Sequence, residues 1–346
     1  TSRTPQFQTT LFNLIVGTTE ILAADLTGIS FIGSRDVSLA GAGVSPQNSM
    51  NFVAVLTEAQ RYDAFYISSD FDGVNIMLDI DTNALTDLGL VDAIYYSGYA
   101  VSETPDRLRP LLSAASVDYG SGDVIFTMNE TIDVTPAHFV NLPDLQLAQT
   151  TGSQDLIMIG STLSSTVDTT TVTIRLTESQ RVAVIKTSGF TPDPNSGEGG
   201  DGVPNVLDML AGAFRDVAGN NNTESTDFVI TEIADDDKPF VLSAIIHLTT
   251  GVLEMEFSET LDLSSTATLP YVVLPNSIEL HQVTGPHINP SPIVPSFFTP
   301  FTPHVDGTRM NLTLTEEDRV QAIRFSATPG GDGSPIILDL KEGAVR

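Results

Sequence analysis

The chain of 346 residues carries 44 acidic and 15 basic residues, and its net charge of −29 would repel a nucleic acid or an anionic membrane surface. It contains no cysteine, which excludes disulfides, thiolate metal sites and cysteine nucleophiles. Its apolar runs are far shorter than the ~20 residues of a membrane-spanning helix, so we expect no direct membrane insertion. The abundance of Val, Ile, Thr and Phe favours strands, and we predict an all-β protein.

The strongest feature of the sequence is an internal repeat, in which three short motifs recur in the same order. The first motif is a strand that ends in an acidic corner, at residues 124–133 (VIFTMNETID) and 253–262 (LEMEFSETLD), with a weaker copy around Glu20. Its apolar residues stand at alternate positions. This alternation predicts half-buried antiparallel strands.

The second motif is L-T-E-x-x-R, at residues 56–61, 176–181 and 314–319. The second and third copies directly follow a second alternating strand, and the threonine of every copy is suited to cap the first turn of a short helix. Gln60, Gln180 or Asp318 three residues later would complete a capping box. The structural anchors predicted from this motif are Thr57, Glu58, Arg61, Thr177, Glu178, Arg181, Thr315, Glu316 and Arg319.

The glutamate and arginine of this motif stand three residues apart, which is the spacing of an ordinary ion pair on one helical turn. Such a local pair is worth a few tenths of a kcal/mol. A catalytic acid with a cation partner is the alternative interpretation, but no histidine belongs to the repeated pattern. We therefore interpret the pair as structural and predict no enzymatic activity.

The third motif is GAFRDVAGN at residues 212–220, matched by GAVR at 343–346 and loosely by residues 83–89. A further strand is predicted after it, at 226–230 in the second copy and at 91–96 in the first. The third copy ends just before this strand. We therefore predict repeat one (1–105), repeat two (106–236) and repeat three (237–346), the last without its final strand. A continuing polypeptide or a strand donated by a neighbouring subunit would complete it.

Acidic clusters are the candidate ion sites. Oxygen ligands suit calcium, which can stiffen the hinge between domains. The candidate calcium ligands are Asp70, Asp72, Asp235, Asp236 and Asp237, although carboxylates in a linker are more often simply solvated. The five histidines lack the spacing of a zinc site. We expect no required cofactor, with calcium as the candidate ion.

Three Asn-x-Ser/Thr sequons mark candidate glycosylation sites, at Asn129, Asn221 and Asn311. Asn311 lies between Met310 and Leu312 in an alternating strand, so its side chain is expected to face solvent if those two face the core. The Pro-rich stretch 286–303 lies where repeat three is longer than repeat two, and its Thr-Pro and Ser-Pro run from Pro290 to Pro303 is a candidate carrier of O-linked sugar.

The order of a proline, an apolar strand, F-S-E-T-L-D (257–262) and D-V-A-G-N (216–220) resembles the Ig-like repeats of bacterial surface-layer and adhesin proteins. The inserted L-T-E-x-x-R segment is similar to repeats of tubular mastigoneme-like proteins of algae and protists. This resemblance implies three tandem immunoglobulin-like β-sandwiches, an extracellular or cell-surface location, and self-association into a filament or layer with covalently attached glycans. An adhesin that binds a glycan or a protein partner is the alternative.

Overall fold

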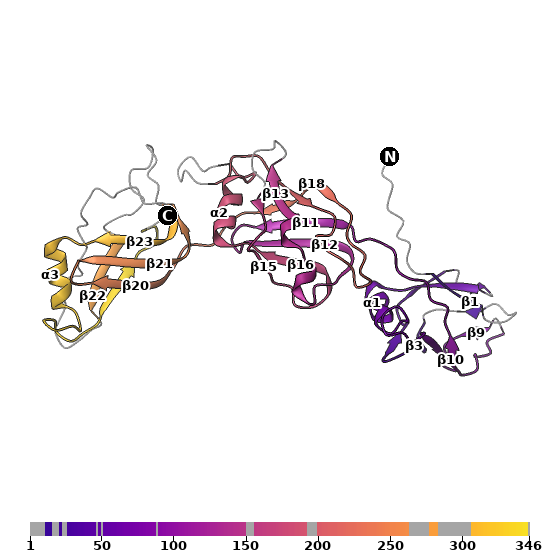
Figure 1. Cartoon of the computed structure of the whole chain (residues 1–346). Helices are drawn as coiled ribbons and strands as arrows, with labels where there is room; N and C mark the ends of the chain where they lie inside the picture. Colours follow the sequence, from indigo (N-terminus) through magenta and orange to yellow (C-terminus); the bar gives the residue numbers. More distant parts are fainter. Residues whose placement is uncertain are drawn as a thin grey trace.

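The computed structural model describes residues 11–15, 21–22, 26–45, 48–49, 51–87, 89–149, 156–191, 199–262, 277–282 and 306–344. Strands dominate this part of the chain, and the prediction of an all-β protein is confirmed. Figure 1 shows three lobes that follow one another along the chain. The buried apolar side chains form separate clusters within residues 26–85, 115–230 and 253–344, so each lobe has a core of its own.

Repeat one contains three small sheets. Their strand orders are β1-β7-β5, β10-β8-β3-β4 and β6-β2-β9. The bounds are β1 (Leu11–Ile15), β2 (Ile21–Leu22), β3 (Ile29–Ile32), β4 (Asp36–Ser38), β5 (Gly43–Ser45), β6 (Asn48–Ser49), β7 (Asn51–Val55), β8 (Met77–Ile80), β9 (Thr86–Asp87) and β10 (Tyr96–Ala100). The strand predicted at 91–96 is wrong in position, because the strand that pairs with β8 begins only at Tyr96.

Repeat two contains a five-stranded sheet, β15-β16-β12-β11-β19, and a four-stranded sheet, β14-β13-β17-β18. The bounds are β11 (Leu112–Asp118), β12 (Asp123–Ile132), β13 (Leu145–Gln149), β14 (Leu156–Ile157), β15 (Thr162–Leu163), β16 (Thr169–Arg175), β17 (Asn205–Met209), β18 (Ser225–Val229) and β19 (Thr231–Ile233). Two 3-10 turns, Ala137–Phe139 and Leu142–Asp144, precede β13. One core between the sheets contains side chains from both.

Repeat three has the sheets β20-β21-β23 and β22-β24. The bounds are β20 (Val241–His247), β21 (Val252–Leu261), β22 (Ile278–Gln282), β23 (Gly307–Thr313) and β24 (Ile336–Leu340). Within the described residues, β24 is the last strand, and the absence of a final strand from repeat three stays a prediction. The Pro-rich stretch 286–303 and Glu20 lie outside the described residues.

The alternation in the sequence places the central strands as predicted. In β21, Leu253, Met255 and Phe257 are buried, while the residues between them are not. β21 pairs with β23 in the same way that β12 pairs with β16, so Leu253 lies opposite Leu312 as Val124 lies opposite Ile174. The period of two in each strand thus directs one face of each hairpin into the core.

Each L-T-E-x-x-R motif begins a helix: α1 (Glu58–Tyr66), α2 (Glu178–Lys186) and α3 (Glu316–Arg324). Thr57 and Thr177 cap their helices in complete capping boxes with Gln60 and Gln180. The glutamine amides also donate to loop carbonyls, as Gln180 does to Ile157 and Ile159. The predicted caps are confirmed, and the two glutamines additionally join each helix to a neighbouring loop.

Replacing Thr177 with alanine is expected to lower the free energy of unfolding by about 1 kcal/mol, because the first turn of α2 loses its cap. Thr177→Ser is the matched control, since it keeps the hydroxyl that accepts from the Gln180 N–H. Urea denaturation of both variants is the measurement. Equal destabilisation by serine and alanine would show that the cap is not the cause.

Candidate functional site

Arg181 at the start of α2 joins repeat two to repeat three. Its guanidinium donates to Glu178 on the same turn, at 2.8 and 2.9 Å. It also donates to Asp235 in the linker at 2.7 Å, and to Glu259 of repeat three at 3.1 Å. The Tyr119 carbonyl accepts a further bond at 2.8 Å. Only 5% of Arg181 is exposed, so one buried cation binds carboxylates from three segments of the chain.

Glu178 makes the second contact between these repeats. Its carboxylate accepts the backbone N–H of Thr260 at 2.7 Å, at the acidic corner where β21 ends. Burial opposes ionisation of Glu178, but the hydrogen bonds from Arg181 and Thr260 outweigh burial and hold its pKa below the usual range. The ionised glutamate therefore fixes the backbone of the next repeat.

The same contacts recur between repeats one and two. Arg61 donates to Glu58 at 2.8 and 2.9 Å, to the linker residue Asp106, and to Glu130 of repeat two at 2.9 Å. Glu58 accepts the backbone N–H of Thr131 at 2.7 Å. We call this set of contacts the clamp: a Glu–Arg pair, a linker aspartate, and a Glu–Thr corner from the next repeat.

A hairpin turn lies against the arginine of α2 and against the arginine of α3. Gly122, between β11 and β12, has a φ of +74°, and a Cβ added there would lie 3.4 Å from the Arg181 side chain. Gly251 has the same φ of +74° in repeat three, with Arg319 at 3.2 Å. Glycine adopts this conformation without strain and leaves room for the arginine stem to cross the turn.

The third copy of the pair makes only the contacts within its own repeat. Arg319 donates to Glu316 at 2.7 and 2.6 Å and to the Leu248 carbonyl at 2.8 Å. Among the described residues, neither a linker aspartate nor a corner glutamate reaches it. The Glu316 side chain is 71% exposed, against 34% for Glu178.

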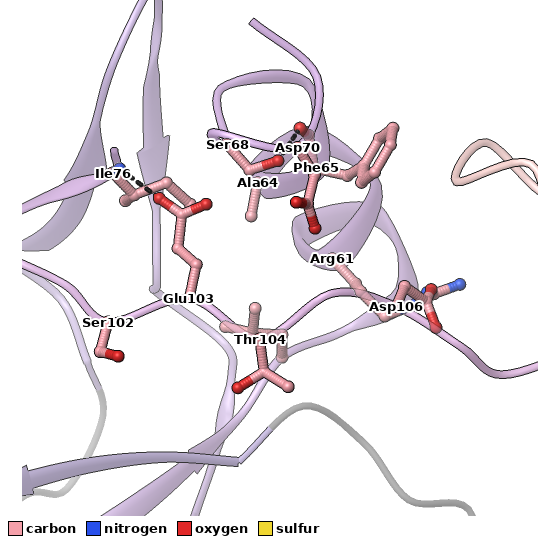
Figure 2. Close-up of a pocket in the computed structure, with 11 residues that line it drawn as sticks. Arg61, Ala64, Phe65, Ser68, Asp70, Ile76, Ser102, Glu103, Thr104 and Asp106 are labelled. Atoms are coloured by element: carbon pink, nitrogen blue, oxygen red, sulfur yellow. Dashed lines mark hydrogen bonds and ion pairs between the residues drawn. The ribbon is translucent and has the colours of Figure 1, made fainter. Parts of the chain in front are cut away.

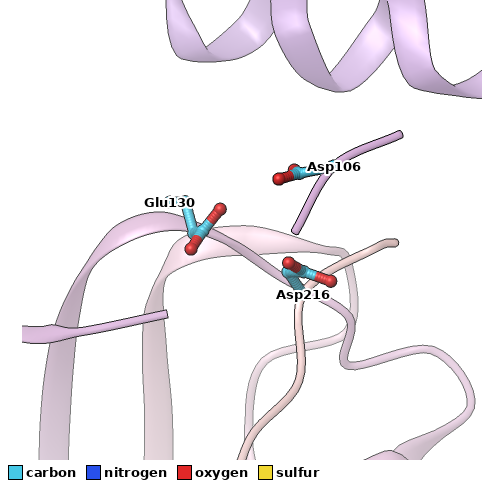
Figure 3. Close-up of side chains that lie close together, drawn as sticks. All are labelled: Asp106, Glu130 and Asp216. Atoms are coloured by element: carbon cyan, nitrogen blue, oxygen red, sulfur yellow. The ribbon is translucent and has the colours of Figure 1, made fainter. Parts of the chain in front are cut away.

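Three carboxyl groups meet beside the first clamp. Asp106, Glu130 and Asp216 point toward one another, with one oxygen from each within 4.8 Å of the others (Figure 3). Burial raises the pKa of Glu130 to about 8, and the charges of Asp216, Asp106 and Glu58 add to this effect against that of Arg61. Burial also raises the pKa of Asp216. This is the one group in the described part of the chain that could hold a metal ion, and Arg61 supplies positive charge beside it.

A small pocket opens between α1 and the linker to repeat two (Figure 2). Its volume is about 100 Å³, and Arg61, Phe65, Ser68 and Glu103 are among its lining residues. Glu103 does not offer a free acid there, since its carboxylate accepts from Ser69 and from the Ile76 N–H. The pocket is therefore a gap beside the clamp. Its wall contains Glu103 of the linker, and the hydrogen bonds from Ser69 to Glu103 attach the linker to the end of α1.

The five predicted calcium ligands lie in two separate places, Asp70 and Asp72 in repeat one and the other three in the linker, where Asp235 and Asp237 both lie beside Gly120. Asp70 is exposed at the rim of the pocket, and Asp72 accepts the N–H of Val74 in a turn. Asp235 belongs to the second clamp, and the exposed Asp236 and Asp237 follow it. None of these five belongs to the cluster of Asp106, Glu130 and Asp216, and calcium binding by them stays a prediction.

The interpretation of the Glu–Arg pairs as merely local was wrong for the first two copies. The helix pair is present, at the expected spacing of three residues. Both arginines also reach Glu130 or Glu259 of the following repeat. The signal in the sequence is the joint recurrence of L-T-E-x-x-R with the acidic corner, because each pair of these motifs meets across a junction.

The three sequons differ in accessibility. Asn221 and Asn311 are exposed, and Asn311 faces solvent from β23 as the alternation predicts. Asn129 is half-buried, and its side-chain oxygen accepts the N–H of Leu111 at 2.6 Å. Because the side chain of Asn129 is less accessible than those of Asn221 and Asn311, the latter two are the better acceptors.

We predict that Asn311 carries N-linked glycan when the protein is secreted from a eukaryotic cell, and that Asn129 remains unmodified. Peptide mass spectrometry before and after enzymatic removal of N-glycans measures both positions. An unmodified Asn311 beside a modified Asn129 would contradict the assignment by exposure.

In the described part of the chain, no helix is long and apolar enough to span a bilayer. No protein-family model matches the sequence, and no curated protein matches it significantly.

Proposed function

We propose that the chain is a non-catalytic structural subunit of an extracellular filament or cell-surface layer, built from Ig-like repeats in a fixed relative orientation. The observation that carries this proposal is the repeated clamp. The same Glu–Arg pair contacts the same Glu–Thr corner in both described junctions. A contact that recurs at each junction suits a protein whose function depends on the geometry of the whole chain.

The chemistry of the clamp suits orientation better than raw stability. The guanidinium is planar and donates along fixed directions, so carboxylates from three segments must take defined positions around it. Replacing buried ion pairs by apolar groups often leaves a protein equally stable, and their best-attested use is to specify one arrangement. A buried arginine between two repeats therefore restricts rotation and bending at that junction.

The surface chemistry agrees with an exposed, extracellular subunit. The net charge of −29 keeps a long particle soluble, and it makes nucleic acid an unsuitable partner. The exposed sequons Asn221 and Asn311 lie on repeats two and three, where they are accessible to covalent attachment of glycan.

One observation favours an adhesin as the second candidate. Repeat one exposes a group of large side chains around β10, in which Ile94 is 80% exposed and Tyr95, Tyr96 and Tyr99 are about half exposed. Exposed tyrosines offer apolar faces with a polar tip, which suits contact with sugars or a protein partner.

Electron microscopy of the native material tests the proposal. An ordered polymer or layer, with a repeat along its length that matches the linked lobes, is the expected result. Isolated particles that bind a glycan array through repeat one would instead support the adhesin. The variant with Tyr95, Tyr96 and Tyr99 all changed to serine is the control for that binding.

A further inference from the structure

Residues 225–235 add the outermost strand to each of the two sheets of repeat two. The first part, β18, pairs with β17, and the second part, β19, pairs in parallel with β11. Ile230 is buried and Phe228 packs against the same core. One extended segment therefore closes an edge of each sheet and covers the core between them.

The corresponding edges of repeat three are open in the described part of the chain. Among the described strands, β24 pairs only with β22, and β20 pairs only with β21. Leu207 and Met209 of β17 are fully buried, whereas Leu338 and Leu340 at the same positions of β24 are only half-buried. Ile245 on β20 is 54% exposed. Within the described residues, repeat three thus presents two strand edges without a pairing partner, with apolar side chains beside them.

The residues that contact the closing segment are polar in repeat two and apolar in repeat three, and this difference indicates which side chain would fit the open site. In repeat two, Glu232 of the closing segment accepts from the Tyr119 hydroxyl and from the Asn205 N–H and side-chain amide. The strand register places Leu248 and Ile336 of repeat three at the positions of Tyr119 and Asn205. Both pack against the apolar cluster that contains Leu280, Leu314 and Ala322. A carboxylate would be unpaired there, so an apolar side chain fits in its place.

Comparison with the clamp indicates a second residue that a docking segment must carry. In repeat two, Asp235 follows Glu232 by three residues and binds Arg181, which the Tyr119 carbonyl also holds. Arg319 is held in the same way by the Leu248 carbonyl and Glu316, and it lacks an aspartate partner among the described residues. A segment that enters repeat three can thus satisfy Arg319 with an aspartate three residues after its apolar anchor.

We propose that repeat three is the docking site for the lead-in segment of a further repeat of this kind: an extended strand with an apolar residue where repeat two has Glu232, and an aspartate three residues later. The segment pairs with β24 and β20 and places its aspartate on Arg319. This inference names the partner of the proposed filament subunit and rests on that function. Where the segment belongs to a second subunit, the contact is heterologous and extends a chain of repeats without closing a ring.

The test uses the full chain and two synthetic peptides with the sequence of residues 223–238, one unchanged and one with Glu232→Leu. We expect the Glu232→Leu peptide to bind more tightly in a fluorescence anisotropy titration. In hydrogen exchange it should protect the backbone amides of β20 and β24. The Arg319→Ala chain should bind this peptide at least about tenfold more weakly, through loss of a charge-assisted bond. Arg175→Ala, which removes an exposed pair with Asp123, is the matched control.

Equal binding of the two peptides, or protection that leaves β20 and β24 unchanged, would overturn the proposal. So would undiminished binding by Arg319→Ala. Protection of the β24 amides from hydrogen exchange in the absence of peptide, together with a dimer detected by sedimentation, would also overturn the proposal. A second copy of the chain would then cover the site. None of these outcomes bears on the stiffness of the two described junctions, which is measured separately.

Discussion

Replacing Arg181 with alanine is expected to lower the free energy of unfolding by about 3 to 5 kcal/mol, the cost of removing one partner from a buried ionic group. Glu178, Asp235 and Glu259 would lose their shared cation while remaining partly buried. Burial and the charge of Asp235 already raise the pKa of Glu259. The loss should appear in urea denaturation and as independent motion of repeats two and three.

Arg319→Ala is the matched control for this prediction. Arg319 makes the same bonds to its helix glutamate and to the hairpin carbonyl, without the two carboxylates of a following repeat. Its replacement should change stability far less than that of Arg181. Similar losses for both variants would show that the pair within the helix, and not the contact between repeats, carries the energy.

The stability of the junction between repeats one and two is expected to fall as pH rises from about 5 to about 8. Glu130 is 98% buried, and its pKa is raised from an ordinary value of 4.5 to about 8 in the folded protein. Between these values the folded state holds a proton that the unfolded state has released. Raising the pH therefore favours unfolding, by about 3 to 5 kcal/mol over the whole range.

Glu130→Gln isolates this effect, because glutamine has the shape of the protonated carboxyl and still accepts from Arg61. Asp106, Asp216, Glu58 and Arg61 face this position from the linker, the D-V-A-G-N turn and α1. The difference in free energy of unfolding between variant and wild type, measured by urea denaturation at pH 5, 7 and 9, should grow with pH in favour of glutamine. A constant difference would contradict the assigned titration.

The local structure was accessible from the sequence because it depends on short-range rules. Alternation in residues 253–257 decides which face of β21 is buried, and Thr177 with Gln180 decides where α2 begins. The position of β10 was not accessible in this way. The apolar residues that precede it predict a strand, yet Val91, Ile94 and Tyr95 are all exposed and β10 begins at Tyr96.

The clamp could not be derived from local rules, because its partners lie far apart in the sequence. Arg61 and Glu130 are brought together only when the linker turns after Asp106 and the acidic corner of β12 reaches α1. The pair at Glu316 and Arg319 has the same local sequence pattern as the other two but makes fewer contacts. Spacing within the helix therefore predicts the pair, and the neighbouring repeat determines its environment.

The central claim is that the clamp fixes the orientation of consecutive repeats. Because the chain contains no cysteine, spin labels can be attached to cysteines introduced at Ser113 in repeat two and Ser243 in repeat three. Pulsed dipolar spectroscopy measures the distribution of distances between the labels. If the clamp fixes the orientation of consecutive repeats, the wild-type distribution is narrow and Arg181→Ala broadens it, while Arg175→Ala does not. A distribution that is broad in the wild type, or equally narrow in Arg181→Ala, would contradict the account.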